Sequence, residues 1–257
     1  MTHNVRDQFD LTGKVAIVTG ASKGIGQAIA LGLGQCGAQV VVSSRKQEAV
    51  DAVVAEFQQA GVKATAVACH MGDMAAIDDL VAKTIDAHGG IDIVVNNAAT
   101  NPVFGPLVEQ QEKAFDQIIN VNIKGPLELA KKAYQSMASR GGGSVINISS
   151  VGGVRPERGL AIYSMSKASL ISLTKSMAQE WGPAGIRVNA ILPGLIQTKF
   201  STALWQNEKL MKQFLQMIPL GRIGQPEEMA ALAVFLAAPA SQYCTGAVFT
   251  ADGGLTI

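Results

Sequence analysis

Short apolar runs recur along the whole chain, and the longer segments between them place an apolar residue at every third or fourth position. The short runs alternate little with polar residues, which is typical of strands buried on both faces of a parallel sheet. We predict seven strands, at 14–19, 39–43, 63–69, 91–95, 144–148, 186–192 and 247–250. The helical spacing between them predicts helices at 24–36, 46–60, 74–88, 111–139, 160–181 and 226–237.

Strands and helices alternate along nearly the whole chain. That order predicts a parallel, doubly wound sheet with right-handed crossovers. No linker, repeat or change of composition divides the chain, and the glycines at 141–143 indicate a helix stop before a strand. We therefore predict an α/β fold, a single Rossmann-type domain over 1–257 with seven parallel strands and helices on both faces.

The composition excludes several classes of partner. The chain has 257 residues, of which 48% are hydrophobic and 16% charged, and its net charge of +1 gives no general attraction to nucleic acid or to an anionic membrane. Residues 1–10 lack the apolar core of a signal peptide, and no segment has eighteen consecutive apolar residues. We expect a soluble, intracellular protein with a small-molecule partner, and no nucleic-acid or membrane partner.

The cysteines and histidines indicate no metal site. The cysteines are far apart and mostly in apolar runs, which favours reduced, structural thiols, and the histidines show no metal-ligand spacing. These residues are Cys36, Cys69, Cys244, His3, His70 and His88.

A glycine-rich turn directly follows the first predicted strand. It runs Thr19-Gly20-Ala21-Ser22-Lys23-Gly24-Ile25-Gly26 and opens the first predicted helix. Glycines let the backbone turn tightly and approach a pyrophosphate, and the helix offers unpaired N–H groups and a positive dipole end. The position of the turn predicts a dinucleotide site, and a close-packed turn without a ligand is the alternative.

A second candidate site lies between residues 150 and 167. Ser150 follows a predicted strand, while Tyr163 and Lys167 stand four apart in a predicted helix and therefore on one face. A free phenol has a pKa near ~10, and a fixed cation beside it favours the phenolate and lowers that pKa. Tyr163 is thus a candidate general acid/base, although the Tyr-x-x-x-Lys spacing alone is a weak signal.

Together the two candidate sites resemble the classical short-chain dehydrogenase/reductases. The resemblance covers essentially the whole chain, because further motifs of that family follow in the same order and spacing. They are Asn96-Asn97-Ala98-Ala99, Asn122 in Val121-Asn122-Ile123-Lys124-Gly125, Ser150 thirteen residues before Tyr163, Pro193-Gly194 with Thr198, and Asp252-Gly253-Gly254. The runs 43–46, 101–105 and 193–196 are similar to one branch, the NADP-dependent peroxisomal carbonyl/retinol reductases.

The resemblance implies a catalytic tetrad of Asn122, Ser150, Tyr163 and Lys167 for hydride transfer between a nicotinamide and a ketone or alcohol. Tyr163 is expected to donate a proton to the carbonyl oxygen, and Ser150 a hydrogen bond to the developing oxyanion. Lys167 is expected to lower the pKa of Tyr163 and to bind the nicotinamide ribose. Asn122 is expected to hold a water that connects Lys167 to solvent, or alternatively to satisfy a local carbonyl from within a helix.

The expected cofactor is NADP(H). NAD enzymes of this fold carry an acidic residue at the end of the second strand, about 20 residues beyond the glycine turn, whereas the first carboxylate here is Glu48. Arg45 and Lys23 occupy the two positions at which NADP-dependent members of the family carry a basic residue. The alternative is that Arg45 is a solvated loop residue without a role in cofactor binding. The cofactor-binding residues that the resemblance implies are Gly20, Ser22, Lys23, Gly24, Ile25, Gly26, Ser44, Arg45, Lys46, His70, Met71, Asn97, Ala98, Ala99, Tyr163, Lys167, Pro193, Gly194, Ile196 and Thr198.

Two positions depart from the family pattern, and the C-terminus departs from the peroxisomal branch. Ala99 replaces a commoner glycine, and its methyl group narrows the space beside the cofactor. His70 occupies the place of the usual adenine-reading aspartate, with Asp73 just beyond it, which puts the adenine contact in doubt. The C-terminal Leu255-Thr256-Ile257 is not a peroxisomal address, so we expect a cytoplasmic location.

The substrate and the assembly follow from the resemblance as well. Residues 195–217 resemble the family's substrate lid, and its apolar composition predicts a hydrophobic or cyclic ketone or alcohol, although packing against the core would give the same composition. A homotetramer is implied through helices 111–139 and 160–181. Small residues suited to close packing there are Ala130, Ala133, Ser136, Ala138, Ser164, Ala168 and Ser172.

Two other functions remain open. A 3-oxoacyl-[acyl-carrier-protein] reductase shares the tetrad and needs a basic patch for its acidic carrier. Five basic residues could form such a patch: Lys131, Lys132, Arg140, Arg155 and Arg158. The alternative is that they are scattered charges on the surface. A non-catalytic nucleotide-binding scaffold would keep the fold, and the complete tetrad argues against it.

Overall fold

A single parallel sheet forms the centre of the computed structural model, which describes residues 4–198 and 208–257. Its strand order is β3-β2-β1-β4-β5-β6-β7, with every neighbouring pair parallel. The strands are β1 (Val15–Thr19), β2 (Gln39–Ser44), β3 (Ala64–Ala68), β4 (Ile93–Asn96), β5 (Gly143–Ile148), β6 (Ile186–Pro193) and β7 (Val248–Ala251). The predicted doubly wound, seven-stranded Rossmann fold is confirmed.

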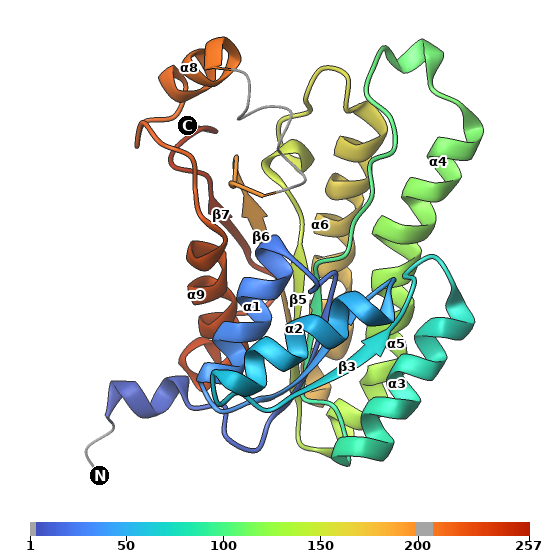
Figure 1. Cartoon of the computed structure of the whole chain (residues 1–257), viewed down its shortest axis with the longest axis vertical. Helices are drawn as coiled ribbons and strands as arrows, with labels where there is room; N and C mark the ends of the chain where they lie inside the picture. The colour runs from blue at the N-terminus through green and yellow to red at the C-terminus, as the bar shows by residue number, and fades with distance from the viewer. Residues whose placement is uncertain (1–3, 199–207) are drawn as a thin grey trace.

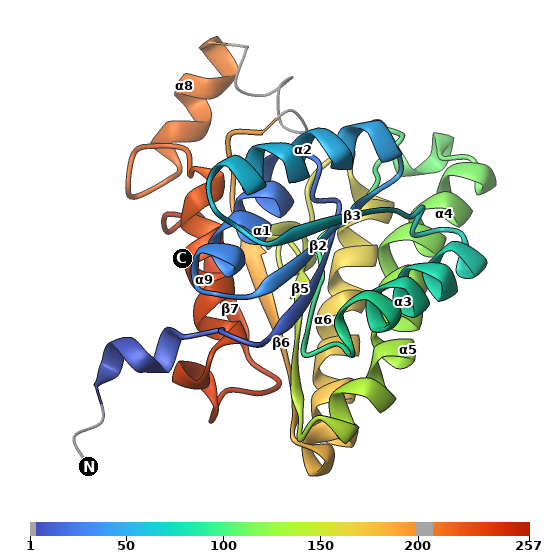
Figure 2. The same ribbon diagram turned by 60° about the horizontal axis from the view of Figure 1, so that its bottom comes forward.

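Helices cover both faces of this sheet (Figures 1 and 2). One face carries α1 (Gly24–Gln35), α2 (Gln47–Gln59) and α9 (Pro226–Ala237), and the other α3 (Met74–His88), α5 (Gly125–Ser139) and α6 (Ala161–Trp181). Two further helices are α4 (Glu112–Ile119) and α8 (Glu208–Gln216), and the short helical turns are η1 (Val5–Phe9), η2 (Leu107–Glu109), η3 (Asn120–Lys124), η4 (Val151–Gly153), η5 (Gly182–Ala184) and η6 (Pro239–Ser241).

Two hydrophobic cores explain why the strand segments lack polar alternation. On β1, Ala16 and Val18 belong to the core under α1, α2 and α9, whereas Ile17 belongs to the core under α3, α5 and α6. Successive side chains of a strand point to opposite faces, so a sheet covered twice needs an apolar residue at every position.

The prediction of one helix over 111–139 is wrong at its centre. Between α4 and α5 the chain forms a π-helical turn, η3. Pro126 in the first turn of α5 has no N–H to donate, which disfavours an uninterrupted α-helix. Gly125 lies so close to Met71 that a Cβ on it would overlap the Met71 carbonyl oxygen. Such π-turns are frequent at functional sites, and this one contains Asn122.

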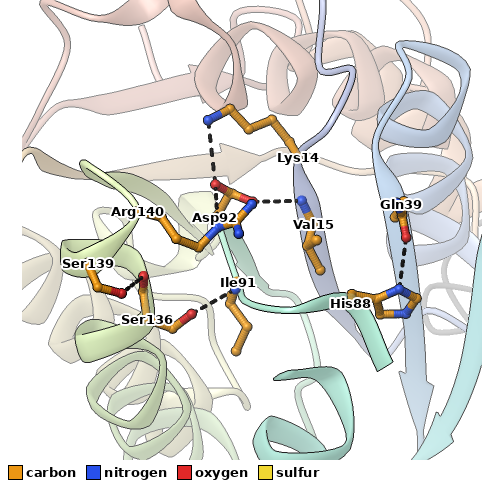
Figure 3. A network of polar contacts seen from close by, with 9 residues as sticks. All are labelled: Lys14, Val15, Gln39, His88, Ile91, Asp92, Ser136, Ser139 and Arg140. Atoms are coloured by element: carbon orange, nitrogen blue, oxygen red, sulfur yellow. Dashed lines mark hydrogen bonds and ion pairs between the residues drawn. The ribbon is translucent and has the colours of Figure 1, made fainter. Parts of the chain in front are cut away.

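A buried carboxylate ties the amino ends of β1 and β4 to the end of α5 (Figure 3). Asp92 is 3% exposed. Its oxygens accept from Val15 N at 2.9 Å, from Arg140 Nε at 3.1 Å and from Arg140 Nη2 at 2.9 Å, and Lys14 Nζ lies 3.5 Å away. This network fixes the relative position of the two central strands, whose opposite ends flank the candidate site.

The cysteines within residues 4–198 and 208–257 are all free thiols. Burial raises the pKa of Cys69 to about 11, which is typical of an unreactive structural thiol. The same residues contain neither a group of three or more His, Cys, Asp or Glu side chains that could hold a metal ion nor a helix long and apolar enough to cross a bilayer.

Candidate active site

The glycine turn lies where the strand order reverses, between β1 and β4, which is the usual ligand position in a doubly wound sheet. Gly20 and Gly24 have φ values of +64° and +59°. A Cβ on Gly20 would stand 2.9 Å from Ala98 Cα, and one on Gly26 would overlap Asn97 Nδ2. The turn therefore requires glycine at these places and leaves a backbone cradle without side chains.

Asn97 and Ala98 shape this cradle. Asn97 Nδ2 donates to Thr19 O at 2.9 Å and to Gly20 O at 3.1 Å. The hydroxyl oxygen of Thr19 accepts from the backbone N–H groups of Asn97 and Ala98, both at 3.1 Å. The two residues thus hold the glycine turn against the end of β4.

The residues around the cradle fit the phosphates of a dinucleotide. Helix α1 begins at Gly24, and no side chain forms a capping hydrogen bond to its first turn. The first N–H groups of this helix are therefore available to an anion bound in the cradle. Lys23 and, at the end of β2, Arg45 and Lys46 are exposed, and none of them forms an ion pair within the described chain. Ser44 is the last residue of β2, beside them.

The other expected cofactor residues fall into two groups. Thr198 lies over the turn, because a Cβ on Gly24 would stand 3.2 Å from Thr198 Cγ2. His70 and Ala99 are exposed near the ends of β3 and β4, and Pro193 and Gly194 end β6 and follow it. Met71 and Ile196 are instead core side chains, 4% and 5% exposed. Asp73 caps α3 by accepting from the N–H groups of Ala75 and Ala76, so its carboxylate is already engaged.

Ser150, Tyr163 and Lys167 meet at the same edge of the sheet. Ser150 follows β5 and accepts from Gly152 N at 3.0 Å, and its side chain is hydrogen-bonded to that of Tyr163. Lys167 is 2% exposed, with its ammonium 5.6 Å from the centre of the Tyr163 ring. Lys167 Nζ donates to Ile148 O at 2.7 Å. The neighbouring Ser149 points away from this group and donates to Lys167 O at 2.8 Å.

The expected lowering of the Tyr163 pKa by Lys167 is not what the structure shows. Burial and, to a smaller extent, the charge of Glu157 raise the pKa of Tyr163, the hydrogen bond from Ser150 opposes the rise, and the net pKa is about 12. Burial also lowers the pKa of Lys167 to about 8, because a low-dielectric surrounding disfavours its charged form. Tyr163 therefore keeps its phenolic proton at neutral pH.

Asn122 is buried in the π-turn and uses its whole side chain locally. Oδ1 accepts from Thr100 N at 2.8 Å, and Nδ2 donates to Thr100 O at 3.0 Å and to Ser166 Oγ at 3.0 Å. Ser166 in turn donates to Tyr163 O at 2.7 Å. The Asn122 amide thus satisfies a nearby backbone and connects the π-turn to the tyrosine helix, while its expected role of holding a water stays a prediction.

A family model described as "Enoyl-(Acyl carrier protein) reductase" matches residues 20–256. The chain belongs to the short-chain dehydrogenase/reductase family. A protein called "Dehydrogenase/reductase SDR family member 4" from Oryctolagus cuniculus is 43% identical over 244 residues, covering 95% of this chain and 94% of the relative. The human protein of that name is 42% identical over the same length, covering 95% of this chain and 88% of its own.

Solved structures of short-chain dehydrogenase/reductases share the whole architecture. A gluconate 5-dehydrogenase from Burkholderia cenocepacia in complex with NADP and tartrate has a TM-score of 0.94 at 31% identity, covering 98% of this chain and 99% of that one. A 7α-hydroxysteroid dehydrogenase complexed with NADH and a 7-oxo bile acid has a TM-score of 0.94 at 33% identity, covering 98% of both chains. The protein is accordingly a nicotinamide-dependent oxidoreductase that acts on small-molecule alcohols or ketones.

Glu157 is a member of the site that sequence reasoning missed. Its carboxylate raises the pKa of Tyr163, and burial raises the pKa of the carboxylate itself. The available signal was an acidic residue six positions before Tyr163 within the same short stretch. The path of that segment depends on packing that no sequence pattern encodes.

Proposed function

We propose that this short-chain dehydrogenase/reductase transfers hydride between NADP(H) and a hydrophobic or cyclic ketone or secondary alcohol. The observation that carries the proposal is the hydrogen-bonded Ser150–Tyr163 pair, with buried Lys167 beside it, at the sheet edge that also carries the glycine cradle. Both halves of a hydride-transfer site, a dinucleotide cradle and a proton donor, then lie at one edge of the sheet.

In the reductive direction a bound nicotinamide supplies the hydride that the carbonyl carbon gains. Tyr163 gives its phenolic proton to the carbonyl oxygen, which completes the secondary alcohol, and Ser150 donates a hydrogen bond to that oxygen as negative charge develops on it. The Lys167 ammonium lies 5.6 Å from the centre of the tyrosine ring, where its charge would favour the phenolate left behind once substrate and cofactor are bound. Asn122 keeps the π-turn and the start of α6 in position through Thr100 and Ser166.

The preference for NADP(H) rests on the end of β2. Arg45 is exposed without an ion pair in the described chain and can hold a 2′-phosphate bidentately, while Lys23 adds a point charge. No carboxylate stands there to repel a phosphate or to grip a ribose hydroxyl. The backbone of the glycine cradle, together with Thr198, would bind the pyrophosphate and the nicotinamide half of the cofactor. His70 would lie next to the adenine.

A 3-oxoacyl-[acyl-carrier-protein] reductase has less support. Of the five basic residues that could dock an acidic carrier, Lys131 pairs with Glu128, Lys132 with Asp78, and Arg140 with Asp92. Only Arg155 and Arg158 remain without an ion pair in the described part of the chain.

The lid, the assembly and the location stay predictions. The proposed lid over 195–217 includes 199–207, which lie outside the described residues, and α8 forms its second half. For the homotetramer, Ala130, Ala133 and Ser164 are buried within the chain itself, so the expectation that they face a partner is wrong. Ala168 and Ser172 on α6 are exposed and keep that prediction open. Light scattering tests the tetramer, and cell fractionation tests the cytoplasmic location.

The test of the proposed function is a panel of hydrophobic and cyclic ketones assayed with NADPH and with NADH. Wild type should reduce members of the panel with a higher kcat/KM for NADPH. Arg45→Ala should lose about ten- to a hundred-fold of that preference, the value of one charge-assisted hydrogen bond. Arg6→Ala, an equally exposed arginine on η1, is the matched control and should keep it. Preferred use of NADH by wild type contradicts the NADP assignment, and no turnover of any ketone contradicts the function.

A further inference from the structure

Glu157 is held rigidly at the edge of the candidate active site. It belongs to the segment between η4 and α6, and its backbone N–H donates to Ser164 Oγ at 3.3 Å. Its carbonyl oxygen accepts from Leu160 N at 3.1 Å. The side chain is half-buried, so its position is set by the start of the same helix that carries Tyr163.

The Glu157 carboxylate lies close to the groups proposed to bind the carbonyl oxygen. A Cβ added to Gly152 would be 3.4 Å from Glu157 Oε1, from Ser150 Oγ and from Ser164 Oγ. Glu157 Oε1 and Ser150 Oγ are therefore separated by no more than twice that distance. A ketone whose oxygen is bound by Ser150 and Tyr163 brings its nearest substituents within reach of this carboxylate.

The Glu157 carboxylate has no charged partner among the residues that the structure describes. Within residues 4–198 and 208–257 it forms no ion pair and accepts no hydrogen bond. Of the neighbouring cations, Arg155 donates through Nη1 to Leu255 O at 3.2 Å, Arg158 is exposed, and Lys167 donates to Ile148 O. The Glu157 oxygens do not belong to the buried, unpartnered polar atoms of the described chain, so they stay open to water and to an approaching substrate group.

An aromatic side chain borders the same loop. Phe104 is 78% exposed, and its ring lies against Gly159, where an added Cβ would be 2.9 Å from the ring. Gly105 N donates to Gly159 O at 3.1 Å and so joins the two segments. This side of the site thus combines an apolar surface with a single negative charge.

We propose that Glu157 determines substrate choice: it binds an ammonium or hydroxyl substituent of a ketone with an apolar body, and it repels ketones that carry a carboxylate. The inference rests on the proposed function, since it requires that a carbonyl oxygen be bound by Ser150 and Tyr163. An ionised substituent interacts with an unscreened charge in a partly buried site more strongly than in water. Glu157 consequently changes the relative kcat/KM of ketones that differ in charge, whereas Tyr163 and Ser150 contact only the carbonyl oxygen that all of them share.

The test compares cyclohexanones that carry a methyl, an ammonium or a carboxylate group at the same ring position. The measured quantity is the ratio of kcat/KM for the ammonium ketone to that for the carboxylate ketone. Wild type should favour the ammonium ketone, and Glu157→Gln should lower the ratio by about ten- to a hundred-fold, which corresponds to one charge-assisted contact. Glu109→Gln removes an exposed charge on η2 and should leave the ratio unchanged.

A pH series gives a second readout that a merely structural role would not move. Because burial raises the pKa of Glu157, lowering the assay pH from neutral into the acidic range should reduce the ratio in wild type. In Glu157→Gln the ratio should not follow that titration. An unchanged ratio in Glu157→Gln while the methyl ketone is still reduced overturns the inference alone. Failure of wild type to reduce any of the three ketones overturns the proposed function and the inference with it.

Discussion

Asn122 and Thr100 exchange two hydrogen bonds, with Thr100 N donating to Oδ1 at 2.8 Å and Nδ2 donating to Thr100 O at 3.0 Å. Thr100 lies beyond the end of β4 and is not part of a strand, so the Asn122 side chain supplies the hydrogen-bond partners that a neighbouring strand would otherwise give its N–H and C=O. Ser166, bonded to the same amide, extends the connection to α6. The π-turn that interrupts the α4–α5 helix therefore has a definite use, since it directs Asn122 toward the end of β4.

Asn122→Ala should lower the free energy of unfolding by about 2–4 kcal/mol, because a buried amide is lost and both backbone groups of the half-buried Thr100 lose their partner. Urea denaturation measures this change. Gln117→Ala on the neighbouring α4 removes an exposed amide without a recorded partner and should change stability by less than about 0.5 kcal/mol. Equal effects of the two substitutions would show that the Thr100 bonds contribute nothing.

Asp92→Asn should destabilise the protein by about 2–3 kcal/mol, since it removes the charge that Arg140 and the Val15 N–H share (Figure 3). The comparison is Asp79→Asn, which breaks an exposed pair with Lys83 and should cost at most about 0.5 kcal/mol. Thermal or urea unfolding distinguishes the two. A small effect at Asp92 would mean that the network does not fix β1 against β4.

The pH dependence of the reaction should reflect the raised pKa of Tyr163, which burial places at about 12. The rate of ketone reduction should stay constant from neutral into the alkaline range, because the phenol keeps its proton, and the rate of alcohol oxidation should rise over the same range. Glu157→Gln removes a charge that raises this pKa, so the alkaline decline of reduction should move to lower pH. An unmoved decline would show that Glu157 does not act on Tyr163.

Ser150→Ala should reduce kcat by about 10²–10³, the effect of losing one hydrogen-bond donor to an oxyanion. Ser149→Ala should reduce kcat by less than about tenfold, because Ser149 donates to the backbone of Lys167 and points away from Tyr163. Steady-state kinetics with one ketone compares the two variants. The reverse order of effects would identify Ser149 as the hydroxyl that binds the substrate.

Local patterns were sufficient to predict the strands and most helices. The runs 74–88 and 226–237 reappear unchanged as α3 and α9. The other predicted helices except 111–139 differ from the observed ones by at most one residue at each end, because apolar periodicity and glycine stops act over a few residues. The break at Asn120–Lys124 depends on contacts of Gly125 with Met71 and of Asn122 with Thr100. Such contacts join distant parts of the chain and leave no periodic signal.

In the candidate site, too, local features could be predicted from the sequence, and features that depend on contacts between distant residues could not. Spacing alone correctly put Tyr163 and Lys167 on one helix face, and the position of the glycines correctly indicated the cradle. The electrostatic balance could not be predicted, because the burial of Lys167 and the approach of Glu157 to Tyr163 exist only after folding. The burial of the Met71 side chain is a further consequence of packing, and its contact with the cofactor stays a prediction.

The central claim is that Tyr163 gives the proton that accompanies hydride transfer, and Tyr163→Phe tests it most directly. The measurement is single-turnover oxidation of bound NADPH by a ketone that wild type reduces, with cofactor affinity determined separately by fluorescence. We predict unchanged folding and cofactor affinity and a rate at least ~10²–10⁴-fold below that of wild type, the contribution of a general acid. Turnover at the wild-type rate by the phenylalanine variant would contradict the account.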